Sequence, residues 1–369
     1  MGRGCEHNSH YFNYPNGMFN MMNARAMELI NFARMMAGSF DFKILHRTSP
    51  NHFSREGGAT LTFERVIGTI LHMVKKAISI EILNVFYDAD IDAQSPARQT
   101  FTESREKVSF KAFAELFQKS CDMVANNPIP KLFKGYRIFA SDGTSFIVGK
   151  MGKALKYFGD STTVAGKAMC RIGCIVDILD NAIVDAVVAP FSKGERAIAI
   201  EQIQRLKHIE NALFLFDRGY WSSELVAEII ENGQKFLMRL PIGYKVSKIK
   251  DKNGKIVKLR RVKVMLSTGE MELLITNISE EEMSDAEIAK LYTMRWGVEV
   301  KYLELKDRLQ IDKFSGKSDN IVLQDIYSTL FISNLVAFLC EVSDEIIEKK
   351  QHVRTTNMNK NQIEACASQ

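Results

Sequence analysis

The spacing of apolar residues changes near residue 134 of this 369-residue chain. The first 60 residues show little clear periodicity, but from about residue 60 to that point apolar side chains recur every three to four positions, which is the period of a helix facing a core. We predict a helix over 24–36 and, from this pattern, two helices over 60–90 and a helix, turn and helix over 95–119. Farther along, short apolar runs alternate with amphipathic stretches, and such alternation is typical of the α/β class.

The second half of the pattern places two aspartates directly after strand-like runs. The run GYRIFAS leads into Asp142 and a turn, and the run ALFLF ends at Asp217. Between them we predict a hairpin turning at Asp180-Asn181, followed by a helix. A helix, a strand, a basic hairpin and a further strand come next, before a last helix capped by Ser284. The order predicts a mixed sheet with flanking helices.

The stretch YTMRWGVEVKYLELK, residues 292–306, reads as one amphipathic helix. At about 100° per residue, four of its polar side chains fall within about 60° of one another: Tyr292, Arg295, Glu299 and Lys306. An apolar stripe lies about a quarter turn away and predicts packing onto a core: Leu291, Met294, Val298, Leu305 and Leu309. For a lone helix, a solvated face with ordinary charges is the alternative.

Aspartates placed after buried strands are candidates for metal ligands, because converging carboxylate oxygens bind Mg²⁺ or Mn²⁺. Asp142 and Asp217 alone would be read as turn or capping residues. Glu299 strengthens the metal interpretation, because its helix carries a tyrosine, an arginine and a lysine on the same side. Two ions held by the three acids would activate a water or a 3′-hydroxyl and stabilise the leaving oxygen of a phosphodiester. The cationic and phenolic neighbours would then hold DNA phosphates.

The net charge of +5 is mild, but basic residues concentrate in one segment. Residues 242–263 carry nine Lys or Arg against one Asp, around Asn253-Gly254, a dipeptide that favours a tight hairpin turn. A basic β-ribbon suits phosphate contact, and its candidate DNA-binding residues are Lys255, Lys258, Arg260 and Arg261. A soluble, exposed hairpin without a ligand is the alternative.

A second candidate DNA-binding element lies in the N-terminal part. Ser95 is a good N-cap and Pro96 suits the first helical position, so we predict a helix from which Arg98, Thr102 and Arg105 project on one face. A helix, short turn and helix with a basic outer face is what a helix-turn-helix needs to enter a major groove. Many small helical domains share this pattern, so simple packing is the alternative.

Composition sets the remaining limits. The chain has 46% hydrophobic and 25% charged residues, as in an ordinary soluble protein. The six cysteines include no CxxC pair, so we expect reduced, buried thiols instead of disulfides or a structural zinc site. We find no apolar run approaching the roughly 20 residues that span a bilayer, and no apolar signal core near the start. We therefore expect a cytoplasmic location and no membrane partner.

Two sets of residues together resemble a known family, the transposases of bacterial insertion sequences. The D-D-E triad of that family is similar to three acids of this chain: Asp142, Asp217 and Glu299. The Y-R-E-K signature of the insertion-sequence family four type, with two, three and six intervening residues, matches four positions: Tyr292, Arg295, Glu299 and Lys306. The resemblance covers roughly 134–339 and, more faintly, 60–119.

This resemblance implies a ribonuclease-H-like catalytic core with a β-rich insertion. The expected divisions are a helical region at 1–125 that binds DNA ends, a catalytic domain at 130–345 with its insertion at about 241–280, and a polar tail at 346–369. The three acids would be catalytic metal ligands for two Mg²⁺ or Mn²⁺ ions. The tyrosine, arginine and lysine of the signature would grip terminal phosphates.

The implied reaction is cut-and-paste DNA transposition. A homodimer would hold two transposon ends and join them to target double-stranded DNA, at the nucleoid of a bacterial cytoplasm. The main alternative is a truncated, catalytically inactive protein that binds the ends and represses a related transposase; the short polar C-terminal portion favours it and the intact acid set opposes it. A metal-dependent nuclease that cuts without joining is a third reading.

Overall fold

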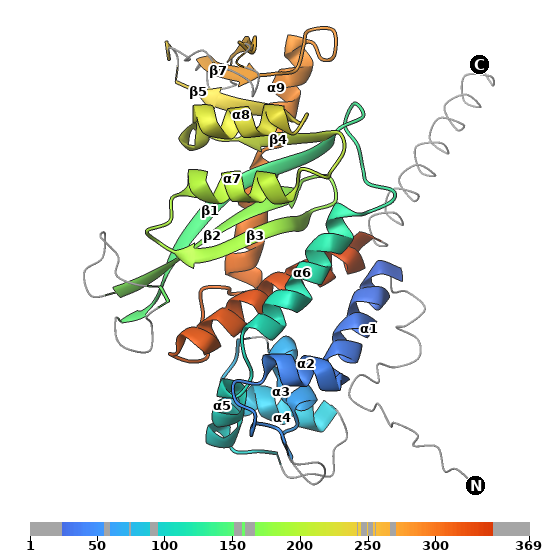
Figure 1. Cartoon of the computed structure of the whole chain (residues 1–369), viewed down its shortest axis with the longest axis vertical. Helices are drawn as coiled ribbons and strands as arrows, with labels where there is room; N and C mark the ends of the chain where they lie inside the picture. The colour runs from blue at the N-terminus through green and yellow to red at the C-terminus, as the bar shows by residue number, and fades with distance from the viewer. Residues whose placement is uncertain are drawn as a thin grey trace, which may run out of the picture.

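The computed structural model describes residues 24–54, 60–73, 75–88, 95–150, 157–158, 167–241, 243–244, 249, 254, 256–265 and 271–341. Helices make up the described part of the chain before residue 126, as the sequence predicted (Figure 1). They are α1 (Ala24–Gly38), α2 (Phe40–His46), α3 (Phe63–His72), α4 (Ile78–Asp88), α5 (Arg98–Glu106) and α6 (Lys111–Ala125). The two helices expected over 60–90 are α3 and α4.

The start of α5 differs from the prediction. Its N-cap is Ala97, with extended backbone and no side-chain cap, so Ser95 and Pro96 precede the helix and do not begin it. The reason lies in packing, because Phe101 and Arg105 on this short helix are completely buried. Burial of one helix face outweighs a favourable capping residue, which contributes only about 1 kcal/mol.

The described strands form one seven-stranded mixed sheet, with the order β3-β2-β1-β4-β5-β7-β6. In chain order the strands are β1 (Arg137–Lys150), β2 (Lys167–Asp177), β3 (Ala182–Pro190), β4 (Ala212–Phe216), β5 (Lys235–Leu240), β6 (Arg260–Met265) and β7 (Met271–Thr276). The first three strands pair antiparallel, and β1, β4 and β5 run parallel. Three antiparallel strands followed by parallel strands on the other side of β1 make a ribonuclease-H-like core, and the α/β prediction is confirmed.

Local sequence explains several of these elements. The hairpin of β2 and β3 turns at Asn181, which adopts a positive φ of 49°, a conformation that asparagine tolerates better than most residues. β4 consists of five buried apolar residues, as a central parallel strand should. α9 (Asp285–Thr293) has Ser284 as its N-cap, as the sequence predicted, and the structure adds a complete capping box with Glu287.

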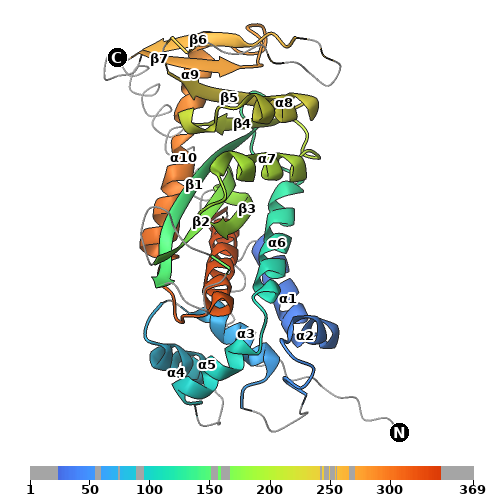
Figure 2. The same ribbon diagram turned by 60° about the vertical axis from the view of Figure 1, so that its left-hand side comes forward.

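Helices cover both faces of the sheet (Figure 2). On one face lie α7 (Glu195–Arg205) and α8 (Ser223–Glu231), and on the other lies α10 (Trp296–Leu303). α7 packs so closely on β2 that a Cβ at Gly173 would lie 2.6 Å from the Ile198 side chain. Tyr302 of α10 holds the opposite face, since its hydroxyl donates to the carbonyl oxygen of Asp142 at 2.7 Å and accepts from the N–H of Cys174 at 3.0 Å.

The insertion after β5 contributes two described strands. β6 pairs antiparallel with β7, and β7 pairs antiparallel with β5. The described strands of the insertion therefore extend the central sheet, and β6 forms its edge. The predicted pairing of the two runs around Asn253-Gly254 falls mostly outside the described residues. Across that turn, the N–H of Val257 donates to the carbonyl oxygen of Ile249 at 2.9 Å.

One helix, Asp319–Glu341, is long and apolar enough by composition to cross a membrane, although no such run was expected from the sequence. In its most apolar window 78% of the residues are buried inside the protein, as in the core helix of a compact domain. Its polar side chains serve packing: Asn334 bonds the backbone of Ile183 in β3 and the hydroxyl of Ser120 in α6. This helix thus joins the sheet to the N-terminal helices.

Candidate active site

Asp142 lies within β1 and not at its end. The sequence predicted a turn after Asp142, but β1 continues to Lys150 because its partner β2 runs beside it throughout, with Asp142 opposite Cys174. On its other side β1 pairs with β4, and that pairing stops at Ala140 and Leu215. Asp142 therefore lies where one edge of β1 becomes uncovered.

Asp217 follows the last residue of β4, as the sequence predicted. Continuing by two residues the parallel register that pairs Ala140 with Leu215 sets Asp142 opposite Asp217. Neighbouring strands lie about 4.8 Å apart, so the two aspartates come from adjacent positions where the strands diverge. The Oδ1 atom of Asp217 is buried and has no hydrogen-bond partner in the part of the chain that the structure describes.

The stretch 292–306 is not the single helix that its spacing predicted. α9 ends at Thr293, α10 begins at Trp296, and the chain continues as a π-helical turn from Glu304 to Arg308. Three-residue backbone bonds, from the N–H of Arg295 to the carbonyl oxygen of Tyr292 for example, tighten the junction. The predicted apolar stripe still faces the core, since Leu291, Val298 and Leu305 are fully buried.

Three of the four signature residues meet at this junction. Nη2 of Arg295 donates to Oε1 of Glu299 at 2.6 Å, and its guanidinium lies 5.9 Å from the ring centroid of Tyr292. The Tyr292 hydroxyl is buried and, among the described residues, has no hydrogen-bond partner. Lys306 is partly exposed, lies in the π-helical turn about two turns farther on, and has no ion pair or hydrogen bond within the described ranges. The structure thus does not bring Lys306 into contact with the other three.

Arg295 links the acids electrostatically. Burial raises the pKa of the Asp142 carboxyl; the N–H of Gly143 and the charge of Arg295 oppose this, and Glu299 adds to it. Burial also raises the pKa of Tyr292, and the charge of Asp217 raises it further. For Arg295, burial lowers the pKa but the hydrogen bond to Glu299 and the charges of its neighbours outweigh it. The charge of Arg295 therefore interacts with those of all three acids.

The three acids are the right type of ligand for a divalent metal, but their side chains are not gathered around one point. Carboxylate oxygens are the ligands that Mg²⁺ and Mn²⁺ prefer, and the unpaired Oδ1 of buried Asp217 is an acceptor without a donor. No group of three or more His, Cys, Asp or Glu among the described residues is close enough to hold a metal ion. The ion pair with Arg295 explains part of this, because it turns Glu299 toward the guanidinium.

The helix α5 does not present the basic face that the sequence predicted. Arg98 is exposed and Thr102 is partly exposed, with its hydroxyl bonded to the carbonyl oxygen of Arg98. Arg105 is completely buried and bonds Gln324, Ser315 and Asp325 of the C-terminal part. The prediction that Arg105 contacts DNA is therefore wrong, because its side chain holds α5 to the helix Asp319–Glu341.

The four basic candidates of the insertion fall into three kinds. Lys258 and Arg261 are exposed, and Arg261 stands on the edge strand β6. Arg260 is partly buried and is bound to Asp285 and to the carbonyl oxygens of Ser279 and Met283, so it fastens β6 to the start of α9. Lys255 lies outside the described residues. The sequence could not separate these roles, because they depend on which face of β6 each side chain occupies.

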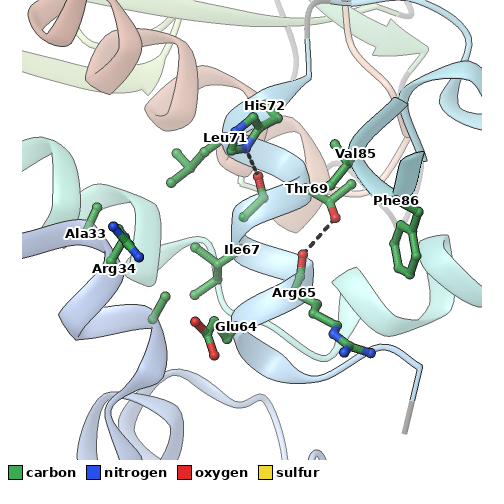
Figure 3. A pocket seen from close by; sticks show the side chains of 12 residues that line it. Ala33, Arg34, Glu64, Arg65, Ile67, Thr69, Leu71, His72, Val85 and Phe86 are labelled. Atoms are coloured by element: carbon green, nitrogen blue, oxygen red, sulfur yellow. Dashed lines mark hydrogen bonds between the residues drawn. The ribbon is translucent and has the colours of Figure 1, made fainter. Parts of the chain in front are cut away.

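A small pocket and a further carboxylate lie outside the predicted set of residues. The pocket in Figure 3, among α1, α3 and α4, encloses only about 30 Å³ and contains none of the candidate acids. Close to Asp142, however, stands a carboxylate that sequence reasoning missed, that of Glu195 at the start of α7. Its only signal in the sequence was its position, as the first residue of the helix that follows the β2–β3 hairpin.

A ribonuclease-H-like sheet with aspartates on two adjacent strands and a glutamate on the facing helix defines a class of candidate metal-dependent nucleic-acid enzymes. Residues 133–335 match the family described as "Transposase DDE domain". The match covers more than half of the chain, and the protein belongs to this family.

Two curated relatives support the same assignment. The transposase InsG for insertion sequence element IS4 of Escherichia coli is 20% identical over 298 residues, which are 72% of this chain and 66% of that protein. A putative transposase for insertion sequence element IS4SA of Synechocystis is 25% identical over 179 residues, 45% of this chain and 52% of that protein. The chain thus spans about two thirds and about half of their lengths. The resemblance to the insertion-sequence family four type is confirmed.

Among solved structures, the chain is similar to a piggyBac transposase determined as a synaptic complex with hairpin DNA. The TM-score is 0.46 at 8% identity, covering 85% of this chain and 75% of that one.

Proposed function

We propose that the protein is a divalent-metal-dependent transposase that cleaves DNA at transposon ends and joins those ends to target DNA. The observation that carries the proposal is the shared register of Asp142 and Asp217 at the point where β1 and β4 diverge, opposite the helix that bears Glu299. Membership of the transposase DDE family supports it.

In this proposal Asp142, Asp217 and Glu299 are the catalytic acids that hold one or two Mg²⁺ or Mn²⁺ ions. When bound, such ions activate a water or 3′-hydroxyl and stabilise the leaving oxygen of the phosphodiester. Holding a cation beside Asp142 also offsets the cost of keeping a partly buried carboxylate ionised. The unpaired Oδ1 of Asp217 gains a partner in the same way.

Arg295, Tyr292 and Lys306 have the proposed role of gripping DNA phosphate near the cut. In the structure the guanidinium of Arg295 is engaged with Glu299 at 2.6 Å, and both phosphate and carboxylate suit its planar donors. We infer that Arg295 exchanges Glu299 for a DNA phosphate, which frees the carboxylate for the metal. Lys306 has no competing ion pair among the described residues and needs no such exchange.

Two exposed basic regions suit the rest of the DNA. Lys258, two residues before β6, and Arg261 on that edge strand would contact phosphates without reading sequence, and Arg98 with Thr102 on α5 would contact the transposon end. The proposed divisions follow: end binding by the helical region 1–125 and catalysis by 130–345, in a homodimer that pairs two ends. The segment 346–369 lies outside the described residues.

The test is incubation of the protein with a DNA fragment bearing the element's ends and Mg²⁺ or Mn²⁺, scored for end cleavage and joining. Metal-dependent cleavage and joining by the wild type, abolished in Asp142→Asn, supports the proposal. Cleavage without joining would reduce it to a nuclease. End binding without any cleavage, unchanged by metal, would favour the DNA-binding repressor.

A further inference from the structure

A fourth acid stands beside the candidate site on the side opposite Glu299. Glu195 is the first residue of α7, which follows β3 and packs on the sheet face away from α10. Its side chain lies against Gly143, the residue after Asp142 in β1. Two helices on opposite faces therefore each deliver a glutamate to the segment of β1 that carries Asp142.

The absence of a side chain at residue 143 permits this approach. A Cβ placed on Gly143 would lie 2.9 Å from both Cγ and Cδ of Glu195 and 3.1 Å from its Oε1. Real Cβ atoms essentially never show contacts below 3.0 Å, so an alanine here would push the carboxyl group away. Beyond Ala140, β1 no longer pairs with β4. The Glu195 carboxylate therefore reaches a part of β1 that β4 leaves unpaired.

The charges of Glu195 and Asp142 also act on each other and on a common neighbour. The charge of Glu195 raises the pKa of Asp142. Tyr220, in the turn after Asp217, has a raised pKa caused first by burial and then by the charges of Asp142 and Glu195. The adjacent Arg196 donates from Nε to the carbonyl oxygen of Gly219 at 2.8 Å, so the first turn of α7 is fixed to the loop that carries Asp217.

The Glu195 carboxylate is held loosely and remains open to a ligand. Its ion pair is with Arg171, whose Nε lies 3.6 Å from Oε1, and 40% of the Glu195 side chain is exposed. Arg171 has other partners, because its Nη1 donates to the carbonyl oxygen of Lys193 at 2.8 Å. By contrast, Glu201 on the same helix is paired with Lys193 at 2.6 Å.

We propose that Glu195 is a fourth carboxylate of the divalent-metal site, delivered by α7 through the opening that Gly143 leaves beside Asp142. The inference rests on the proposed metal-dependent function. Its chemistry is that of a hard cation that keeps several water ligands, since Mg²⁺ dehydrates reluctantly. A carboxylate beside the aspartate ligand accepts hydrogen bonds from such waters and adds negative charge, so Glu195 positions the ion and raises its affinity.

The experiment measures Mn²⁺ binding to the whole protein without DNA, from the electron paramagnetic resonance signal of free Mn²⁺. Glu195→Gln keeps the shape of the side chain and removes its charge, and we expect affinity to fall about 10-fold, the scale for residues that support a metal ligand. Glu201→Gln, on the same helix with the same change of charge, should bind Mn²⁺ like the wild type.

A second pair of variants tests the route through the glycine. Gly143→Ala should reproduce the loss seen in Glu195→Gln, because its methyl group displaces the carboxylate. Gly194→Ala is the matched control, since a Cβ at Gly194 meets nothing within 4 Å. Circular dichroism and thermal unfolding confirm that each variant is folded before binding is measured.

The outcomes separate this inference from the proposed function. Loss of Mn²⁺ binding in Asp142→Asn with unchanged binding in Glu195→Gln overturns the role of Glu195 and leaves the metal site standing. Unchanged binding in both variants overturns the metal site itself and the inference with it. Loss in both, with normal binding in Glu201→Gln, supports the fourth carboxylate.

Discussion

Two arginines with acidic partners lie in different parts of the molecule, and the sequence suggested DNA contact for both. Arg105 of α5 donates to Gln324 at 3.0 Å, to Ser315 at 2.5 Å and to Asp325 at 3.1 Å. Arg295 donates to Glu299 at 2.6 Å, and its charge acts together with those of Asp142 and Asp217. The first group of residues joins two helices, and the second lies where the pairing of the central strands β1 and β4 ends.

The difference between the two groups is the satisfaction of their polar atoms. Around Arg105 the partner Asp325 is also bonded to Ser315 through both oxygens and paired with Lys75 at 3.9 Å. Around Arg295 the Oδ1 of Asp217 and the hydroxyl of Tyr292 have no hydrogen-bond partner among the described residues. Buried polar groups are nearly always bonded, so a satisfied network indicates structure and an unsatisfied one indicates a ligand.

The largest expected effect comes from neutralising an acid of the unsatisfied group. Asp217→Asn should lower the end-cleavage rate by roughly 10³- to 10⁴-fold, the scale for losing one member of a catalytic set. Its free energy of unfolding should stay within about 1 kcal/mol of the wild type, because no internal bond to Oδ1 is lost. Cleavage assays and urea unfolding measure the two quantities. A variant that unfolds easily but cleaves normally would reverse the comparison.

The satisfied group should behave in the opposite way. Asp325→Ala leaves the buried Arg105 without its anion and should lower the free energy of unfolding by about 3 to 5 kcal/mol. Glu103→Ala, at an exposed position of α5, is the control and should cost under about 1 kcal/mol. Thermal and urea unfolding decide the matter, and equal losses in the two variants would show that the buried network contributes little.

Acid provides a further check on the same group. Burial raises the pKa of Asp325, but the charges of Arg105 and Lys75 outweigh burial and hold the pKa below its usual 3.8. A depressed pKa means that the unfolded chain binds the proton first. The stabilisation is therefore fully present above pH 3.8 and is lost as the pH falls through the lower, folded-state pKa. Asp325→Ala should show a shallower loss of stability in that range.

Intermediate effects are expected for the side chains proposed to grip phosphate. Arg295→Ala and Lys306→Ala should each slow cleavage by an amount equivalent to about 1.5 to 3 kcal/mol, the scale of a charge-assisted hydrogen bond. Tyr292→Phe should cost less, because it removes one hydroxyl. A titration of Mg²⁺ and Mn²⁺ against cleavage rate separates the roles: Glu299→Asp should be partly rescued by Mn²⁺ and Lys306→Ala should not. Rescue of Lys306→Ala by metal would move that residue to the metal site.

The smallest effect is expected at the edge strand. Neutralising Lys258 and Arg261 together should weaken DNA binding regardless of sequence and reduce the slope of log affinity against log salt by about 0.9 for each residue. Salt-dependent binding to end and random DNA measures it. Arg260 is left unchanged because it fastens β6 to α9. An unchanged slope would mean that the side chains of Lys258 and Arg261 do not contact phosphate.

Sequence by itself determined the class of fold and the identity of the candidate site residues. Apolar periodicity follows from which face of an element is buried, and this is a local property, so α7, β4 and the N-cap Ser284 were predicted correctly. The spacing of Tyr292, Arg295, Glu299 and Lys306 is likewise local, and it identified the family that the comparisons confirm.

Only the tertiary structure decided what each charged side chain does, because that depends on partners far away in the chain. Arg105 is bonded 220 residues away to Asp325 and not to solvent, and Arg260 is bound to the start of α9. Asp142 and Asp217 share a register only because β1 and β4 pair in parallel. The spacing of residues 292–306 predicted one continuous helix. The junction at Met294 and Arg295 and the later π-helical turn interrupt it. Burial and hydrogen bonding between distant segments set these outcomes, and no local pattern records them.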